Sequence, residues 1–493
     1  MIKRALQLNI YSIAANGAVL VTGVLFSVIL TRILSVGDYG LLTSFVSFVA
    51  FITMFSDMGL RTTATKYVGD ALFSKNKNLW RYITKLAALR VSLVALIGIL
   101  IFAFAGQLAG AVLHSTSYAF VFQITAVAAV IYAVMNFFEG LVSAANRYEY
   151  TFAGSAIVSV GRLVLPIIAA MLIAPTPGWA MVGVGLGYLA GAVAYLVFFK
   201  RTYGTGFDWS GHLPAGLKSY AMYAALIMLA SAFLTNFDTV LLNTFLSPQS
   251  VALYKAAQMV LIGVISLAPI SYGLIFTLFV ELESTGKRNE QQEAYAKAAK
   301  YALTFFIPIS FMMFVLAPEI IGFFYLPTYA ASASALRAFA VLPAFYFFFN
   351  MNMSTLLARS EMKIAGALYL LAAVCSLGLN LLLIPQFGFV GSAIAYSAAF
   401  IIPTIISVPV LARKLSLSVH ANEIVRPLVV SVIASGVILF VQGMQAVPWV
   451  VLLFLFPLVC AALYLLMLDA DDRHIMGLLQ ELFLHKGRGG EKK

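Results

Sequence analysis

Long apolar segments separated by short polar connections dominate this sequence. An α-helix needs about 17 to 25 predominantly apolar residues to cross the hydrocarbon core of a bilayer. The apolar runs are continuous and lack the alternation of barrel strands, so they predict a bundle of helices. Fourteen spans are expected, near residues 8–30, 39–57, 83–105, 119–138, 152–173, 180–199, 219–241, 252–279, 300–318, 331–353, 364–384, 389–411, 427–443 and 448–467.

Composition and charge point to a membrane protein. The 493 residues are 62% hydrophobic and only 10% charged, which excludes an ordinary soluble domain. The net charge of +12 would suit a nucleic-acid partner only if the cations gathered on one surface. Instead, if the spans alternate in direction, 26 of the 31 Lys and Arg fall on one side of the membrane. By the positive-inside rule that side is cytoplasmic and holds both termini.

An internal repeat divides the spans into two sets. Leu34-Ser35 at the end of the first span recurs as Leu246-Ser247 at the end of the seventh. The connection after the fourth span repeats after the tenth, and WAMVG at 179–183 corresponds to FGFVG at 387–391. An even number of spans in each repeat keeps both halves in one orientation. We therefore predict an all-α protein of two six-helix lobes, related by a pseudo-two-fold axis along the membrane normal, plus two C-terminal helices.

The predicted units are an N-terminal lobe at 1–205, a C-terminal lobe at 206–415, and the extra helices with a cytoplasmic tail at 416–493. The tail segment 474–485 places its apolar residues on one helical face. Such a helix can lie on the inner leaflet or against the bundle, and the sequence leaves both open.

The sequence has no pattern typical of an enzyme. All five histidines fall in connections or the tail, no glycine-rich phosphate loop is present, and no acidic cluster has metal-ligand spacing. We therefore predict no catalytic residue, metal or cofactor.

Charges inside the apolar spans are the candidates for function. Arg162 lies about 15 Å along the span 152–173, near mid-membrane. A charge there costs at least about 2.5 to 3.5 kcal/mol, so Arg162 is expected to face a wet cavity rather than to form a structural ion pair. Arg90 lies about 10 Å into its span, where it would line an inner vestibule or extend to the headgroups.

The remaining charged candidates lie nearer the span ends. Outer-end cations that would contact a substrate, or extend to the headgroups instead, are Arg32, Lys255 and Arg337. Asp57 is expected to pair with Arg61, four residues on, on one helix face. Asp238 is expected to balance the charge of Lys255 or Arg337, with coupling to a transported cation as the alternative.

This intramembrane set is more basic than acidic, so it would attract anions. The planar fork of arginine donates two parallel hydrogen bonds to phosphate. The sequence thus indicates an anionic amphiphile whose head crosses inside the protein while its tail stays in lipid.

Three short motifs resemble polysaccharide flippases of the Wzx type. The turn 35–40 reads SVGDYG and the end of the second span, 57–60, reads DMGL. At the start of the second lobe, NFD at 236–238 is followed by VALY at 251–254, where Ala252 replaces the family's usual glycine. The resemblance in length, span number and repeat covers nearly the whole chain.

This resemblance implies a member of the multidrug/oligosaccharidyl-lipid/polysaccharide exporter superfamily in a bacterial or archaeal plasma membrane. Such proteins move undecaprenyl-pyrophosphate-linked oligosaccharides to the outer leaflet by alternating access. The expected partners are this substrate, membrane lipid and a polysaccharide polymerase or other assembly proteins. Alternatives are a lipid II flippase, a cation-coupled multidrug extruder that uses Asp238, and a non-transporting scaffold of the polysaccharide machinery.

Overall fold

The computed structural model describes residues 2–268, 272–359, 361–415, 421–444 and 447–466, and this part of the chain is helical without any strand. The helices are α1 (Ile2–Ile33), α2 (Val36–Asp57), α3 (Leu60–Phe73), α4 (Leu79–Ala103), α5 (Ala105–Leu113), η1 (Thr116–Tyr118), α6 (Ala119–Ala144), α7 (Tyr148–Leu172), α8 (Pro177–Tyr203), α9 (Ala215–Phe245), α10 (Pro248–Ser266), α11 (Tyr272–Ser284), α12 (Arg288–Val315), α13 (Ala317–Phe324), η2 (Pro327–Tyr329), α14 (Ser332–Phe339), α15 (Leu342–Ala358), α16 (Met362–Leu415), α17 (Ala421–Gly443) and α18 (Trp449–Leu466).

The number of membrane spans is compatible with the predicted fourteen. Ten helices in the described residues are long and apolar enough to cross a membrane, or eleven if the bent pair α14 and α15 forms one span. Helix α16 covers 54 residues and is interrupted at Gly388, which has a φ of 59°, so it holds two spans. The shorter apolar stretches in α1 and α18 would bring the number to fourteen if each of them also crosses the membrane.

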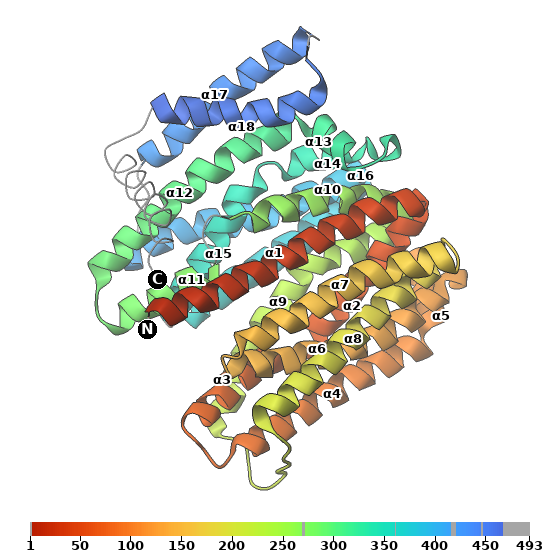
Figure 1. Ribbon diagram of the computed structural model, residues 1–493, viewed down its shortest axis with the longest axis vertical. Coiled ribbons are helices and arrows are strands. Elements are labelled where there is room, and N and C mark those ends of the chain that lie inside the picture. Colours follow the sequence, from red (N-terminus) through yellow and green to blue (C-terminus); the bar gives the residue numbers. More distant parts are fainter. Residues whose placement is uncertain (1, 269–271, 360, 416–420, 445–446, 467–493) are drawn as a thin grey trace, which may run out of the picture.

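The repeat predicts two lobes, and we name the helices by that prediction. Lobe 1 comprises α1–α8, lobe 2 comprises α9–α16, and α17 and α18 pack against the outside of lobe 2 through α12 and α13 (Figure 1). Helices α1 and α2 also contact α10, and α9 contacts α2, so the lobes share an interface. The boundaries after residues 205 and 415 stay a prediction, and the predicted helix at 474–485 lies outside the described residues.

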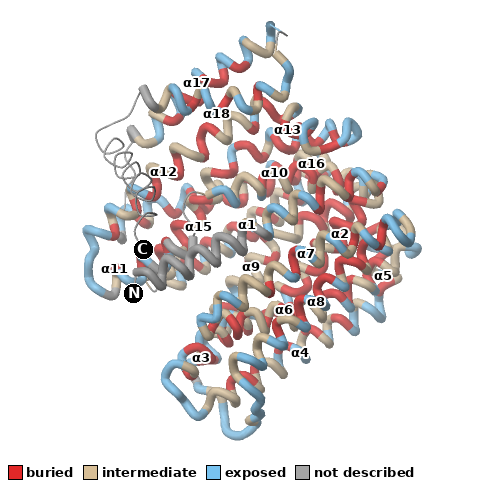
Figure 2. Tube along the Cα trace, in the orientation of Figure 1, coloured by how far each residue is buried: buried red, intermediate tan, exposed pale blue. Residues whose placement is uncertain are grey.

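The buried side chains mark where the two lobes pack and where lipid should lie. Figure 2 shows buried residues along the helices of both lobes. The largest core cluster extends through both lobes, and a smaller one joins α3, α4 and α6 with Leu217 of α9. Only 22% of the apolar window in α4 is buried. Because exposed apolar faces of this length are favourable only in hydrocarbon, these surfaces indicate a multi-pass membrane protein.

The two lobes meet where the repeat places equivalent residues. Ser35 and Ser247 occupy the residue before α2 and α10, and Gly40 of α2 lies directly against Pro248 of α10. A Cβ on Gly40 would lie 2.6 Å from the carbonyl carbon of Pro248, and nearer still to its oxygen. The absence of a side chain at Gly40 therefore lets the two helix starts touch. We call this the outer contact, after the membrane side predicted for it.

Candidate functional site

Close packing of α7 on α8 sets the position of Arg162. A Cβ on Gly183 would lie 2.6 Å from the Cα of Pro166, and one on Gly187 would lie 2.8 Å from the amide nitrogen of Arg162. Small residues allow such close approach of helix backbones in membranes. The backbone at Arg162 is therefore held against α8, which sets the point from which its side chain extends.

The Arg162 guanidinium lies beside an aromatic ring and has no acidic partner. Its central carbon is 5.4 Å from the centre of the Tyr188 ring, which in turn packs on Tyr132 at 4.6 Å. The residue is half-buried, and its Nε atom is buried without a hydrogen-bond partner. No carboxylate pairs with it in the part of the chain that the structure describes. Its charge is therefore available to an anion.

Arg90 has a different environment, which corrects the expectation that it lines a vestibule or extends to the headgroups. It is 0% exposed, and it donates to the Ser56 hydroxyl at 3.0 Å and to the Thr53 carbonyl at 2.9 Å. Its Nε lies 3.6 Å from Oδ1 of Asp57. Because these groups enclose the guanidinium, Arg90 forms a buried ion pair between α4 and α2 rather than a surface for a ligand.

The predicted side-chain pair of Asp57 with Arg61 is wrong. Asp57 accepts a hydrogen bond from the backbone amide of Arg61 at 3.3 Å, but the Arg61 guanidinium pairs with Glu139 of α6 at 3.3 Å. Helix α2 ends at Asp57, and the chain turns through Met58 and Gly59, which both have positive φ. This turn breaks the helix, so the spacing of four residues does not bring the two side chains together.

Asp238 lies in a buried polar network of lobe 2. It accepts hydrogen bonds from the Tyr254 hydroxyl, from the Thr239 amide at 2.6 Å and from Gln258 Nε2 at 3.4 Å. Lys255 donates to the other end of the Gln258 amide at 2.7 Å. Gln258 therefore bridges Asp238 and Lys255, which lie close together as expected. They form no direct ion pair in the described structure.

The two remaining cations lie at the surface. Arg32 is exposed in the last turn of α1, and Arg337 is exposed in the last turn of α14. The cationic residues predicted for the substrate thus come from five helices and have three kinds of environment. Arg90 is enclosed and paired, Arg162 and Lys255 are half-buried, and the other two are exposed.

Sequence reasoning missed several polar partners. They are Ser56, Thr53 and Glu139 in lobe 1, Tyr254 and Gln258 in lobe 2, and the pair Ser44 and Asn243 between α2 and α9. The polar residue three or four places from a span charge is a usable signal for Gln258. Thr53 and Tyr254 also lie within four residues of the span charges Asp57 and Lys255, but the contact of Thr53 and Ser56 with Arg90, and that of Glu139 with Arg61, join residues more than 30 positions apart and give no such signal.

A bundle of helices long enough to cross a membrane, with an arginine inside one of these spans, defines a polytopic membrane protein. The chain belongs to the polysaccharide biosynthesis protein family, whose sequence profile matches residues 6–283, more than half of its length.

Known proteins agree with this membership. A probable low-salt glycan biosynthesis flippase of Haloferax volcanii is 23% identical over 245 residues, which are 48% of this chain and 51% of the relative; the chain thus spans about half of that protein.

Solved structures show the same fold. The lipid II flippase MurJ in its inward closed conformation aligns with a TM-score of 0.76 at 14% identity, over 94% of this chain and 98% of that one. An inward-facing multidrug resistance transporter of the MATE family aligns with a TM-score of 0.64 at 13% identity, over 83% and 94%. These likenesses show the fold of the protein, and the family profile places it among the polysaccharide biosynthesis proteins.

Proposed function

We propose that this protein moves an oligosaccharide linked to undecaprenyl pyrophosphate from the cytoplasmic to the outer leaflet of the plasma membrane by alternating access. The observation that carries the proposal is the state of Arg162, a guanidinium within a membrane-spanning helix that lacks a carboxylate partner in the described structure. A diphosphate would supply the missing negative charge and accept two hydrogen bonds from the fork.

The substrate class is also supported by the relatives. The family profile is that of polysaccharide biosynthesis, and the Haloferax relative is described as a glycan biosynthesis flippase. These favour a lipid-linked oligosaccharide over lipid II, although MurJ shares the fold. Both termini would lie in the cytoplasm, as the distribution of Lys and Arg predicts, where the polymerase and other assembly proteins are further proposed partners.

Replacement of Arg162 by alanine is expected to weaken binding of undecaprenyl pyrophosphate by about 10- to 100-fold, because a hydrogen-bonded charge contributes about 1.5 to 3 kcal/mol. Arg162→Lys should give an intermediate loss, since it keeps the charge without the fork. The measurement is the ligand-dependent shift in the melting temperature of purified protein, together with surface polysaccharide in cells that carry each variant at equal protein level.

The matched control is Arg147→Ala, which removes an exposed arginine that pairs with Glu149, two residues on, at 3.4 Å. It should bind and transport like the wild type. Unchanged ligand shift and polysaccharide in Arg162→Ala would refute the assignment of the diphosphate to this residue. If the ligand does not stabilise the wild type either, a scaffold without transport becomes the better explanation.

A cation-coupled drug extruder is the second candidate, and the buried position of Asp238 favours it. For the flippase we expect Asp238→Asn to leave cellular drug accumulation unchanged, because no drug is carried. An extruder coupled through this carboxylate would instead lose drug efflux when its charge is removed. Accumulation of a fluorescent cationic drug in cells with wild type, Asp238→Asn or no protein separates the two.

A further inference from the structure

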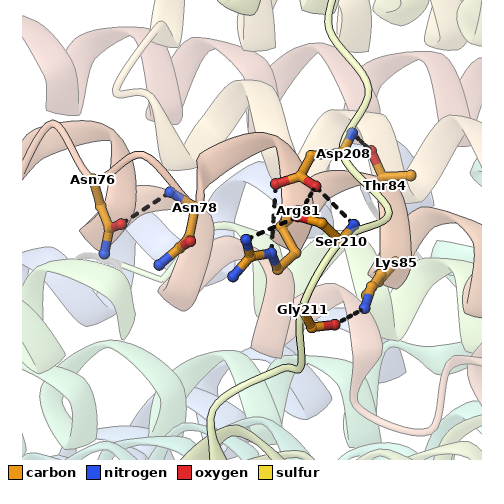
Figure 3. A network of polar contacts seen from close by, with 8 residues as sticks. All are labelled: Asn76, Asn78, Arg81, Thr84, Lys85, Asp208, Ser210 and Gly211. Carbon is orange, nitrogen blue, oxygen red and sulfur yellow. Dashed lines mark hydrogen bonds and ion pairs between the residues drawn. The ribbon is translucent and has the colours of Figure 1, made fainter.

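The connection between the two lobes packs along the first turns of α4. Residues 204–214 join α8 to α9, and Figure 3 shows their polar contacts with α4. Asp208 pairs with Arg81 Nε at 3.4 Å, and Arg81 also donates to the Ser210 hydroxyl at 3.0 Å. Lys85 donates to the Gly211 carbonyl.

Two further features hold this connection close to lobe 1. A Cβ on Gly206 would overlap the Trp80 ring, and one on Gly211 would lie 2.9 Å from the Arg81 guanidinium. Hydrogen bonds from the Ser210 hydroxyl and amide, with smaller effects of the Arg81 and Lys85 charges, hold the pKa of Asp208 below its usual range. The carboxylate is therefore ionised at neutral pH and carries the charge that pairs with Arg81.

This fixed connection presents two aromatic side chains outward. Phe207 is 77% exposed and Trp209 is 58% exposed. Their rings stack with centres 6.3 Å apart and planes within 9°, and Lys85 Nζ lies 5.9 Å from the Trp209 ring centre. Nothing in the described chain covers this pair, which we call the aromatic pair. An exposed apolar surface is typical of a contact with a partner or a membrane.

The location of the aromatic pair and the charge around it favour a membrane over a protein as its binding partner. The connection joins the ends of two spanning helices, α8 and α9, and lies on the beginning of a third, so it sits at the level of the headgroups. Within 79–88 and 200–218 the only acidic residue is Asp208, and the basic ones are Arg81, Lys85, Lys200, Arg201 and Lys218. The last three are exposed. This excess of cations matches an anionic leaflet.

We propose that the aromatic pair inserts among the headgroups of anionic lipids and anchors the connection between the lobes to the membrane surface. Aromatic rings favour this depth because their apolar faces meet the acyl chains while polar edges stay hydrated. The surrounding cations add an attraction that depends on the charge of the leaflet. The anchor acts on lobe 1, and its existence does not depend on what the protein transports.

The test uses the fluorescence that Trp209 contributes to the full-length protein in nanodiscs. This contribution is the emission lost in Trp209→Phe, which keeps an aromatic ring and leaves Trp80 in place against Gly206. Nanodiscs are made from phosphatidylcholine alone or with phosphatidylglycerol, each with and without lipids brominated near the headgroup. The matched control is Trp449→Phe, which removes an exposed tryptophan at the start of α18. The emission lost in this variant is obtained by the same subtraction from the wild type.

We expect brominated lipid to abolish most of the Trp209 emission, and more so with phosphatidylglycerol, while aqueous acrylamide quenches it weakly. High salt should reduce the difference between the two lipid compositions. Emission that acrylamide quenches and brominated lipid does not would overturn the proposal and make the aromatic pair a protein-docking surface. Equal quenching in both lipid compositions would overturn the preference for anionic lipid.

Discussion

Arg90→Ala is expected to lower the free energy of unfolding by about 3 to 5 kcal/mol, because it leaves the buried carboxylate of Asp57 without its cation. Arg90 is fully buried and also satisfies the Ser56 hydroxyl and the Thr53 carbonyl, so the single change removes three interactions at one site. Unfolding of the purified protein in mixed micelles with increasing dodecyl sulfate, followed by circular dichroism, measures the loss.

A double variant shows whether charge or packing is responsible. Asp57→Leu with Arg90→Met replaces both ions by apolar side chains of similar length, and such exchanges of buried pairs are often neutral or stabilising. We therefore expect the double variant to recover most of the stability lost in Arg90→Ala. A double variant as unstable as the single one would contradict this, since the cost would then come from lost packing.

Arg162→Ala is the matched comparison in the same lobe. Because Arg162 has no carboxylate partner in the described structure, its removal leaves no uncompensated charge, and the stability should stay near that of the wild type. Arg90→Ala should therefore lower the stability of the protein, whereas Arg162→Ala should weaken ligand binding and leave the stability unchanged. A loss as large as that of Arg90→Ala would mean that Arg162 also has a structural ion pair.

Gly40→Ala is expected to open the outer contact. The added methyl group would overlap the carbonyl of Pro248. This carbonyl belongs to the backbone and cannot rotate away as a side chain could, so α2 and α10 must move apart. Overpacking of this kind typically costs about 1 to 3 kcal/mol. In a transporter that works by alternating access, the state with the lobes joined at this end would lose population and transport would fall.

A nearby hydrogen bond provides the measurement. Asn243 Nδ2 donates to the Ser44 hydroxyl at 2.9 Å, which joins α9 to α2 close to the outer contact. With Cys375 and Cys460 replaced by alanine, Ser44→Cys and Asn243→Cys should form a disulfide under mild oxidation, and Gly40→Ala should reduce its yield severalfold. The control is Gly185→Ala on α8, where a Cβ would meet nothing within 4 Å. Equal disulfide yields in both glycine variants would show that the helices accommodate the methyl group.

The sequence was sufficient for the membrane architecture. Runs of apolar residues long enough to span a bilayer can satisfy their backbone only as helices, so fold class and approximate span positions follow from local composition. The repeat of Leu34-Ser35 as Leu246-Ser247 correctly placed two equivalent helix junctions, which the structure brings into the outer contact. These features depend on the residues within one segment, or on comparison of two segments, and need no knowledge of packing.

The roles of the span charges depended on the tertiary structure. Sequence alone marks Arg90 and Arg162 as similar charges in similar helices. Folding brings Asp57 from α2 to Arg90, while Arg162 meets the ring of Tyr188. A charge inside a membrane protein is neutralised by whichever groups neighbouring helices supply, and those lie tens of residues away in the chain. The sequence therefore located the costly charges, and the packing of the helices decided which one is left for a ligand.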